Sequence, residues 1–387
     1  MKLVYLSTQR IPTEKAYGVQ ISSMCKSFAL GGAEVTLLVP SRRGEQGDDV
    51  FAYYGIAPST FRVTRLSAPE FHWPGFLERF AFWIVYSLAS IRLAGHAKRL
   101  RPDVVYTRDF LPAAFLALIG VPVCFEEHRN RGAAVYRLLS VLRVPAVAVT
   151  GHLKSQMVAG GYQDREVLVG HDGADLKAFE IAATQEQERI ALHLPENWPL
   201  VCYVGSLRTM GMEKGIRELI EAFAIAHAEL PGCFLLIVGG SAADIAHYRT
   251  VTAQLQIQDA VLFVGHQSPQ RVPRYLRAAD IAVLPFPDNP HFSRDMSPLK
   301  LFEYMASGMP IIASDLPSVR EIVSEKDVFF TKPGNHASLV AAIVESIRNT
   351  EEAARKGERV LQLANKYSWD ARVRAITHFI KQSHDNI

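Results

Sequence analysis

Residues 293–315, SRDMSPLKLFEYMASGMPIIASD, carry acidic, basic and small side chains at a spacing that suggests specific chemistry. Ser297 is a favourable N-cap, and Pro298 suits the first position of a helix. The free N–H groups at such a helix start favour an anion. A carboxylate one to two turns further along, such as Glu303, is suited to accept hydrogen bonds from a sugar diol.

The helix that must position these residues has an apolar and a polar face. Its apolar positions repeat at i, i+3 and i+7 and are Leu299, Phe302 and Ala306. Its polar positions have the same spacing and are Lys300, Glu303 and Ser307. Gly308 and Pro310 end the helix, and residues 310–314 predict a short buried strand. The alternative is an ordinary amphipathic helix between two strands.

The order S-P-L-K-L-F-E-Y-M-A-S-G-x-P resembles the motif of the family 4 glycosyltransferases, which have the GT-B fold. Those enzymes hold a nucleotide-sugar donor with two glutamates separated by seven residues. The resemblance implies that Asp295 contacts the donor sugar, that the amides of residues 296–299 contact the phosphates, and that Glu303 contacts the ribose. Asp295 is one methylene shorter than the family's glutamate, so the identity of the sugar stays open.

Length and composition indicate the class of protein. A chain of 387 residues indicates about two domains, and contents of 49% hydrophobic and 21% charged residues are typical of a globular protein. The net charge of +3 does not indicate a nucleic-acid partner. Four scattered cysteines without a C-x-x-C pair favour neither a disulfide framework nor a zinc site. MKLVYLST lacks the apolar run of a signal peptide and no segment is long enough to span a membrane, so we expect a cytoplasmic protein.

The first half of the chain predicts a parallel doubly wound sheet. Residues 2–7 read as a strand, 8–18 as a polar loop and 19–30 as a helix, with a second strand following. Ligands bind at the carboxyl end of such sheets, which is where the loop with Gly18 lies. The resemblance implies a phosphate or acceptor contact at Gly18; the alternative is a glycine that permits a turn. No G-x-G-x-x-G follows the strand, which disfavours a dinucleotide-dependent oxidoreductase.

Polar residues also arrive at the carboxyl ends of two later strands. Arg108 and Asp109 end the first of them, and Glu127, His128 and Arg129 end the next. The resemblance implies that His128 hydrogen-bonds the donor sugar near the reacting carbon, and a structural role is the alternative. The other four residues are the candidates for the acceptor site.

Residues 71–101 combine an aromatic helical stripe with a basic end. The stripe consists of Phe76, Phe80, Trp83, Ile84, Ser87, Ile91 and Ala94. One interpretation is a peripheral membrane surface. The other, which we favour at this stage, is a core helix whose last turn carries cations that suit the helix dipole.

The second half begins after residues 176–198, which are polar and read as a linker. A strand ends at Gly205, and Lys214 precedes a glycine and a helix start; the resemblance implies that this lysine binds pyrophosphate. Ser206 stands where the family usually has arginine. The sequence leaves open whether Arg208 or Lys300 supplies the missing charge.

A later strand of the second half, residues 261–265, is followed by His266 and Gln267. The resemblance places this loop beside the nucleotide base, whereas an ordinary polar loop is the alternative. The segment Tyr367-Ser368-Trp369 resembles the family pattern in which the last helix crosses back to the first domain.

Together these observations predict an α/β protein of the GT-B fold, with two Rossmann-like doubly wound domains that face each other across a cleft. We expect an acceptor domain at 1–175, joined by the helix 368–387, and a donor domain at 176–367. The expected donor-binding residues are Gly18, Ser206, Arg208, Lys214, His266, Asp295, Met296, Ser297, Pro298, Leu299, Lys300 and Glu303. Those expected to be catalytic are His128, Lys214 and Asp295.

The expected activity is retaining transfer of a sugar from a nucleoside-diphosphate sugar to an acceptor hydroxyl in cell-envelope glycan, glycolipid or glycoconjugate synthesis. No D-x-D stands in a setting that would hold a metal, so we expect neither metal nor cofactor. Expected partners are the donor and a glycan, lipid-linked or small-molecule acceptor, with contact to the inner face of the membrane as a further option. The alternatives are a nucleotide-sugar epimerase or hydrolase of the same fold and a non-catalytic partner subunit.

Overall fold

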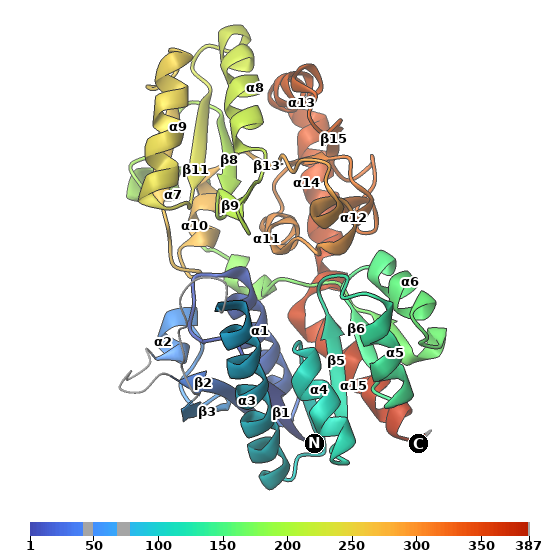
Figure 1. Cartoon of the computed structure of the whole chain (residues 1–387). Helices are drawn as coiled ribbons and strands as arrows, with labels where there is room; N and C mark the ends of the chain where they lie inside the picture. Colours follow the sequence, from blue (N-terminus) through green and yellow to red (C-terminus); the bar gives the residue numbers. More distant parts are fainter. Residues whose placement is uncertain (42–48, 68–77, 386–387) are drawn as a thin grey trace. The chain divides into compact units, whose positions relative to one another are not determined.

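The computed structural model describes residues 1–41, 49–67 and 78–385, which form two units (Figure 1). Unit 1 contains Met1–His171 and Trp369–Ile387, and unit 2 contains Asp172–Ser368. The junction between His171 and Asp172 lies slightly before the boundary expected at 175/176. The last helix belongs to unit 1.

Unit 1 is built on a sheet of parallel strands in the order β3-β2-β1-β4-β5-β6-β7. Its strands are β1 Lys2–Leu6, β2 Glu34–Ser41, β3 Arg62–Ser67, β4 Val104–Thr107, β5 Val123–Glu127, β6 Ala146–Ala148 and β7 Val167–Val169. The central strands are nearly continuous apolar runs because both faces of a parallel sheet are covered by helices. The strand order reverses between β1 and β4, and such a switch point opens a ligand site at the carboxyl ends.

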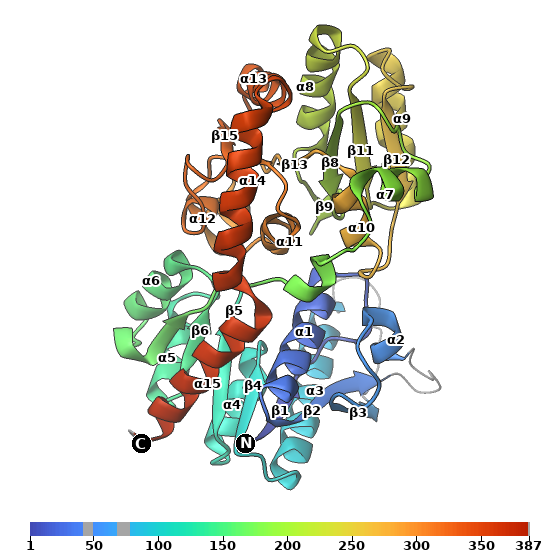
Figure 2. The same ribbon diagram turned by 180° about the vertical axis from the view of Figure 1, so that it is seen from behind.

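Helices cover both faces of the unit 1 sheet. They are α1 Ala16–Leu30, α2 Val50–Tyr54, α3 Glu78–Arg99, α4 Phe110–Leu118, α5 Ala133–Val141, α6 Gly151–Ala159 and α15 Trp369–Asp385, with a 3₁₀ turn η2 at Asp164–Glu166. Figure 1 shows α3 and α4 in front of the sheet, and Figure 2 shows α1 and α15 in front of its opposite face. The two ends of the unit's chain therefore pack side by side, as α1 contacts α15.

Unit 2 repeats this architecture with a parallel sheet in the order β12-β11-β8-β13-β14-β15. Its strands are β8 Leu200–Val204, β11 Phe234–Val238, β12 Val261–Gly265, β13 Ile281–Leu284, β14 Ile311–Ser314 and β15 Phe329–Thr331. A short antiparallel hairpin, β9 Arg208–Thr209 and β10 Met212–Glu213, follows β8. The switch point lies between β8 and β13. The expectation of two Rossmann-like doubly wound sheets is confirmed.

The helices of unit 2 form two hydrophobic layers, one on each face of the sheet. They are α7 Gln185–Ala191, α8 Ile216–Glu229, α9 Ala242–Gln254, α10 Val272–Ala278, α11 Leu299–Ser307, α12 Pro317–Arg320, α13 His336–Arg348 and α14 Thr350–Ala364, with short helical turns η3 Leu176–Phe179, η4 His291–Asp295 and η5 Asn365–Tyr367. Residues of α8, α9 and α13 form the core on one face, and residues of α10, α11 and α14 form it on the other (Figure 2).

The linker interpretation of residues 176–198 is wrong. Thr184 and Gln187 form a capping box that starts α7. Two buried side chains of this helix, Glu188 and Arg189, pair with Arg274 and Asp280 at 2.8 and 2.6 Å. Polar composition suggested a linker, but the charges are partnered inside the unit and so belong to its packing.

The segment 71–101 forms helix α3 from Glu78, and residues 71–77 lie outside the described residues, as do the side chains of Phe76 and Phe80. The core interpretation is correct only for the face that includes Leu93, Ala94 and Ala97. Of the predicted stripe, Ala94 is buried and Ser87 half-buried, but the core interpretation is wrong for Trp83, Ile84 and Ile91, which are 44 to 52% exposed. Their neighbours Phe82 and Leu88 are 61 and 44% exposed. Among the described residues, no helix is long and apolar enough to cross a bilayer.

Candidate functional site

The strongest candidate site in unit 2 lies at the carboxyl ends of β8 and β13. The chain leaves β8 through Gly205 and Ser206, makes the β9–β10 hairpin and enters α8 at Gly215. Gly215 has a φ of +78°, and a Cβ atom there would lie 1.7 Å from the carbonyl oxygen of Pro285, which follows β13. Only glycine permits this approach, which brings Lys214 to the switch point.

Lys214 is half-buried, and its Nζ donates a hydrogen bond to Ser206 Oγ at 3.0 Å. Burial, together with the positive charge of Lys300, lowers the pKa of Lys214 to about 8. The ammonium groups of these two lysines are therefore close enough to repel each other. Such an arrangement favours an anion that interacts with both.

Lys300 reaches the site from the first turn of α11. A Cβ atom on Gly205 would lie 3.6 Å from Lys300 Cε, so the lysine runs across the glycine at the end of β8. Its Nζ pairs with Glu303 Oε2 at 2.6 Å, which confirms that positions 300 and 303 share one face of the helix. Arg208, the other candidate for the missing charge, pairs instead with Glu213 at 3.1 Å and Asp244 at 3.4 Å.

The start of α11 differs in detail from the expected cap. The helix begins at Leu299, and Ser297 Oγ accepts a hydrogen bond from the Asp172 backbone N–H at 2.8 Å instead of capping the helix. Of the amides expected to contact phosphate, that of Met296 donates to the His291 carbonyl at 3.1 Å, and Pro298 has no N–H. Ser297 and Leu299 remain as the candidate donors within residues 296–299. Leu299 is half-buried, and the apolar face is formed mainly by Leu301, Phe302, Tyr304, Met305 and Ala306.

Asp295 and His291 both lie in the π turn η4 that precedes α11. Burial lowers the pKa of His291, the Asp295 carboxylate opposes that shift, and the Lys214 charge adds to it. His291, which the motif did not single out, therefore interacts electrostatically with Asp295 and with Lys214. His266 is exposed in the loop after β12, and its role beside a base stays a prediction.

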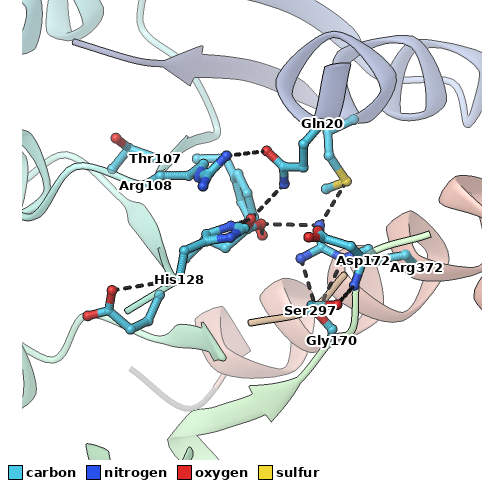
Figure 3. A network of polar contacts seen from close by, with 12 residues as sticks. Gln20, Thr107, Arg108, His128, Gly170, Asp172, Ser297 and Arg372 are labelled. Carbon is cyan, nitrogen blue, oxygen red and sulfur yellow. Dashed lines mark hydrogen bonds and ion pairs between the residues drawn. The ribbon is translucent and has the colours of Figure 1, made fainter. Parts of the chain in front are cut away.

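In unit 1, the candidate residues cluster at the β1/β4 switch point around one buried carboxylate. His128 Nε2 contacts Glu126 Oε1, and Arg108 donates to Gln20 Oε1 at 2.9 Å (Figure 3). Gln20 Nε2 in turn donates to Glu126 Oε1 at 2.6 Å. Burial and the charge of Arg108 lower the pKa of His128 to about 3, although Glu126 opposes this shift. The imidazole is therefore neutral at physiological pH.

The four acceptor-site candidates differ in exposure. Asp109 is buried and accepts a hydrogen bond from the Thr8 backbone N–H at 2.7 Å. Glu127 is fully buried, and its Oε1 accepts from the His128 and Arg129 amides and from Arg131 Nε. Both carboxylates thus fix loops at the strand ends. Arg129 is exposed and Arg108 half-buried, so the arginines are the better placed to reach an acceptor.

Gly18 lies inside α1, so the turn interpretation is wrong. A Cβ atom there would lie 2.2 Å from Tyr54 Oη and 2.6 Å from Thr13 Cγ2. Tyr54 itself closes the loop after β1, since its Oη accepts from the Thr13 backbone N–H at 2.8 Å and donates to the Thr13 carbonyl oxygen at 2.9 Å. The observed reason for glycine is close packing; a ligand contact stays a prediction.

Sequence reasoning missed Glu126, Gln20 and Arg372, which together complete the network around His128. One signal could have found the first of them. Glu126 lies within an otherwise apolar strand, and a charged residue there must be paired. No local pattern predicts Gln20 and Arg372 as its partners, because they come from the first and last helices of the unit.

Comparison with known proteins shows which glycosyltransferases the chain is similar to. Residues 184–362 match the family model described as Glycosyl transferases group 1. The amylovoran biosynthesis glycosyltransferase AmsK of Erwinia amylovora is 26% identical over 219 residues, which cover 57% of this chain and 50% of AmsK. The sulfoquinovosyl transferase SQD2 of Arabidopsis thaliana is 20% identical over 360 residues, covering 84% of this chain and 66% of SQD2. The chain spans about half the length of the first curated relatives it matches.

Solved structures resemble the chain over nearly its full length. Anabaena Alr3699/HepE in complex with UDP and glucose superposes with a TM-score of 0.74 at 17% identity, covering 98% of this chain and 99% of HepE. Sucrose-phosphate synthase from Thermosynechococcus elongatus gives a TM-score of 0.76 at 18% identity, with both chains covered completely. At these identities the likeness shows the fold, which is that of the GT-B glycosyltransferases. The match to the group 1 glycosyltransferase model lies within unit 2, from α7 to α14.

Proposed function

We propose that the protein is a retaining glycosyltransferase that transfers a sugar from a nucleoside-diphosphate sugar to an acceptor hydroxyl without a metal. The observation that carries this proposal is the pair of lysines, Lys214 and Lys300, beside Ser206 at the end of β8. A diphosphate supplies the negative charge that two neighbouring ammonium groups favour. Lys300, rather than Arg208, then replaces the arginine that the resemblance leads one to expect at Ser206.

In the proposed reaction, the bond between the anomeric carbon and the phosphate oxygen breaks, and its electron pair leaves with the diphosphate. The acceptor oxygen bonds to the anomeric carbon on the same face, and its proton passes to the leaving phosphate oxygen. Negative charge grows on the diphosphate, so the two lysines and the first amides of α11 stabilise the transition state more than the ground state. The motif resemblance supports retention of configuration.

The remaining roles follow the same resemblance. Glu303 accepts hydrogen bonds from the ribose hydroxyl groups. Its ion pair with Lys300 holds the carboxylate next to the proposed phosphate subsite. Asp295 and His128 accept hydrogen bonds from hydroxyl groups of the donor sugar. The solved structures of HepE contain UDP or UDP-glucose, which makes UDP-sugars the first donors to test.

We further propose an acceptor from cell-envelope glycan or glycolipid synthesis. Relatives support this class: TuaH of Bacillus subtilis is described as a putative teichuronic acid biosynthesis glycosyltransferase, and the Streptococcus pneumoniae relative as an alpha-monoglucosyldiacylglycerol synthase. The second is 29% identical over 147 residues, covering 38% of this chain and 32% of that synthase. A glycolipid acceptor is presented at a membrane surface, and one face of unit 1 has the corresponding chemistry.

That face, here called the α3 face, is defined by Phe82, Trp83, Ile84, Leu88 and Ile91. Exposed basic residues on α3 and in the nearby helices and loops are Arg92, Lys98, Arg99, Arg101, Arg137 and Arg143. Between residues 82 and 145, Asp103 is the only exposed carboxylate, because Asp109, Glu126 and Glu127 are buried. Exposed aromatic and aliphatic side chains in a stretch of chain with many exposed basic residues and one exposed carboxylate favour an anionic lipid surface.

The test of the donor site is thermal unfolding of the full chain with UDP, GDP, ADP and inorganic pyrophosphate, each with and without magnesium. One nucleotide should raise the midpoint equally with and without magnesium, because it binds only the folded state. Glu303→Ala should weaken that nucleotide at least tenfold without weakening pyrophosphate, since the ribose contact is lost whereas Lys300, freed from its ion pair, keeps its charge. Lys366→Ala, an exposed lysine on η5, is the matched control and should bind like the wild type.

Turnover and binding measurements together distinguish between the alternative functions. Full-rate consumption of a nucleotide-sugar without any acceptor would favour an epimerase or hydrolase. Absence of a shift with every nucleotide would favour a non-catalytic partner subunit. Equal loss of UDP and pyrophosphate binding in Glu303→Ala would contradict the ribose assignment.

A further inference from the structure

Unit 1 contains a buried charge that the proposed catalytic roles do not use. Glu126 is the fourth residue of β5, and its side chain is completely buried. A carboxylate taken out of water is costly unless donors surround it. The arrangement of those donors indicates what the residue does.

Four side chains, each from a different part of unit 1, contact the Glu126 carboxylate. Three of them, Gln20, His128 and Arg372, are labelled in Figure 3. On Oε1 they are Gln20 Nε2 from α1, at 2.6 Å, and His128 Nε2 from the loop after β5. On Oε2 they are the Tyr106 hydroxyl from β4 and Arg372 Nη1 from α15, the latter at 3.2 Å. A carboxylate has about four acceptor positions, so Glu126 has no capacity left for a substrate. It therefore acts through its neighbours.

Arg372 keeps this carboxylate charged. Burial alone would raise the pKa of Glu126, but Arg372, His128 and Arg108 outweigh it and hold that pKa far below its usual range. Arg372 is itself fixed by the carbonyl oxygens of Gly170 and His171, at 3.1 and 2.8 Å. The last helix of the chain thus supplies the counter-ion at the end of β5.

An ionised carboxylate can only accept hydrogen bonds, which determines the state of the histidine. Since His128 Nε2 contacts Glu126 Oε1, Nε2 must carry the proton. The imidazole is neutral, so Nδ1 has the free lone pair and is the acceptor. The opposite tautomer would place two lone pairs against each other.

We propose that Glu126 is a positioning residue that fixes His128 as the Nε2–H tautomer. Nδ1 is then left to accept a hydrogen bond from a hydroxyl group of the donor sugar. The inference rests on the proposed function, in which His128 contacts that sugar. Arg372 is the second positioning residue, because its positive charge keeps Glu126 ionised. Loss of such an orienting partner typically costs about 10–100-fold in activity.

The experiment is nitrogen NMR of the full chain labelled with ¹⁵N-histidine, with the His128 signals identified by their absence in His128→Gln. The wild type should show a protonated Nε2 and an unprotonated Nδ1 at neutral pH. A protonated Nδ1, alone or as part of an imidazolium, would overturn the proposal without any variant of Glu126. Because no turnover is measured, this arm stands even if the proposed transferase activity fails.

Glu126→Gln supplies the second arm. Its neutral amide both donates and accepts, so the Nδ1–H tautomer should appear and turnover should fall about 10–100-fold. Binding of free UDP, attributed to unit 2, should stay within a factor of two. An unchanged tautomer with reduced thermal stability would mean that Glu126 is merely structural, and would refute the positioning role.

Glu127→Gln is the matched control, because it neutralises the adjacent buried carboxylate, whose oxygen accepts from backbone amides and Arg131 rather than from the imidazole. It should leave the His128 tautomer as in the wild type; a shift equal to that of Glu126→Gln would contradict the specific contact.

Glu126→Asp keeps the charge and serves if the glutamine variant does not fold. It should retain the Nε2–H tautomer, and loss of that tautomer would count against the proposal. Full turnover of His128→Ala would instead refute the proposed role of His128 while leaving the tautomer result intact.

Discussion

At the scale of single residues, we expect Lys214 to make the proposed donor site sensitive to pH. Its pKa is lowered to about 8 by burial and by Lys300, and a bound diphosphate reverses that shift by favouring the charged form. Above pH 8, binding must therefore take up a proton, and affinity for UDP should fall by up to about tenfold per pH unit. The terminal phosphate is ionised well below this range, as phosphates have a second pKa of about 6.

Isothermal titration of UDP between pH 7 and 10, in buffers of different ionisation enthalpy, measures both the affinity and the proton uptake. Lys214→Arg should bind with little pH dependence, because a guanidinium stays charged throughout. A wild-type affinity that is flat over this range would show that Lys214 does not contact the diphosphate.

The residue scale also separates what sequence can predict from what it cannot. Lys214, Lys300 and Glu303 follow from local rules, because a strand-ending glycine, a helix start and an i, i+3 spacing fix their neighbours. The proposed choice of Lys300 over Arg208 did not follow from the sequence. It depends on Asp244, which lies on a helix after the next strand and pairs with Arg208.

At the scale of elements, α3 is the helix whose sequence was most misleading. Aromatic and aliphatic residues occur all around it, so periodicity alone does not tell which face is buried. The structure buries the small residues Ala89, Ser90, Ala94 and Ala97 together with Leu93, which allow close packing, and leaves the large residues of the α3 face exposed. Substituting these exposed side chains tests the proposed membrane contact.

The α3 face should bind vesicles that contain anionic lipid, with weaker binding as ionic strength rises from about 0.1 to 0.5 M. Trp83→Ser with Ile91→Ser should reduce that binding at least tenfold, since burying each side chain contributes roughly 1.5–3 kcal/mol. Co-sedimentation measures the effect. Thermal stability should hardly change, because the two side chains are 49 and 52% exposed.

The control for this pair is Leu30→Ser with Ile225→Ser, which removes two apolar side chains of α1 and α8 that are at least as exposed, at 66 and 52%. These variants should sediment with vesicles like the wild type. Equal losses in both pairs, or no binding by the wild type, would remove the membrane proposal and leave the α3 face without an assigned lipid contact.

At the scale of the whole molecule, the alternation of strands and helices was sufficient to predict two parallel sheets, because right-handed crossovers allow few other arrangements. The polar composition of residues 176–198 suggested a linker that does not exist, since charged residues of this segment are paired inside unit 2. Nor could any local pattern predict that Arg372, near the C-terminus, completes the surroundings of His128. Such contacts arise from the fold as a whole.

The packing of α15 provides the prediction at this scale. Its buried apolar side chains are Trp369, Val373, Ile376, Phe379 and Ile380. At roughly 1.5–3 kcal/mol each, their burial contributes about 8–15 kcal/mol, which is comparable with the stability of a whole domain. Deleting residues 369–387 also removes the counter-ion of the buried Glu126. We therefore expect unit 1 to lose its cooperative unfolding transition in calorimetry.

Unit 2 has its own two-layered core and all of the residues assigned to the diphosphate, so the same truncated chain should keep one transition that UDP shifts upward. Loss of both transitions would mean that the two units fold as one cooperative system. Retention of both would show that the α1–α15 packing contributes little, and would leave Glu126 buried without the charge that keeps it ionised. Because those outcomes differ in the number of transitions and in their response to UDP, a single calorimetric series distinguishes between them.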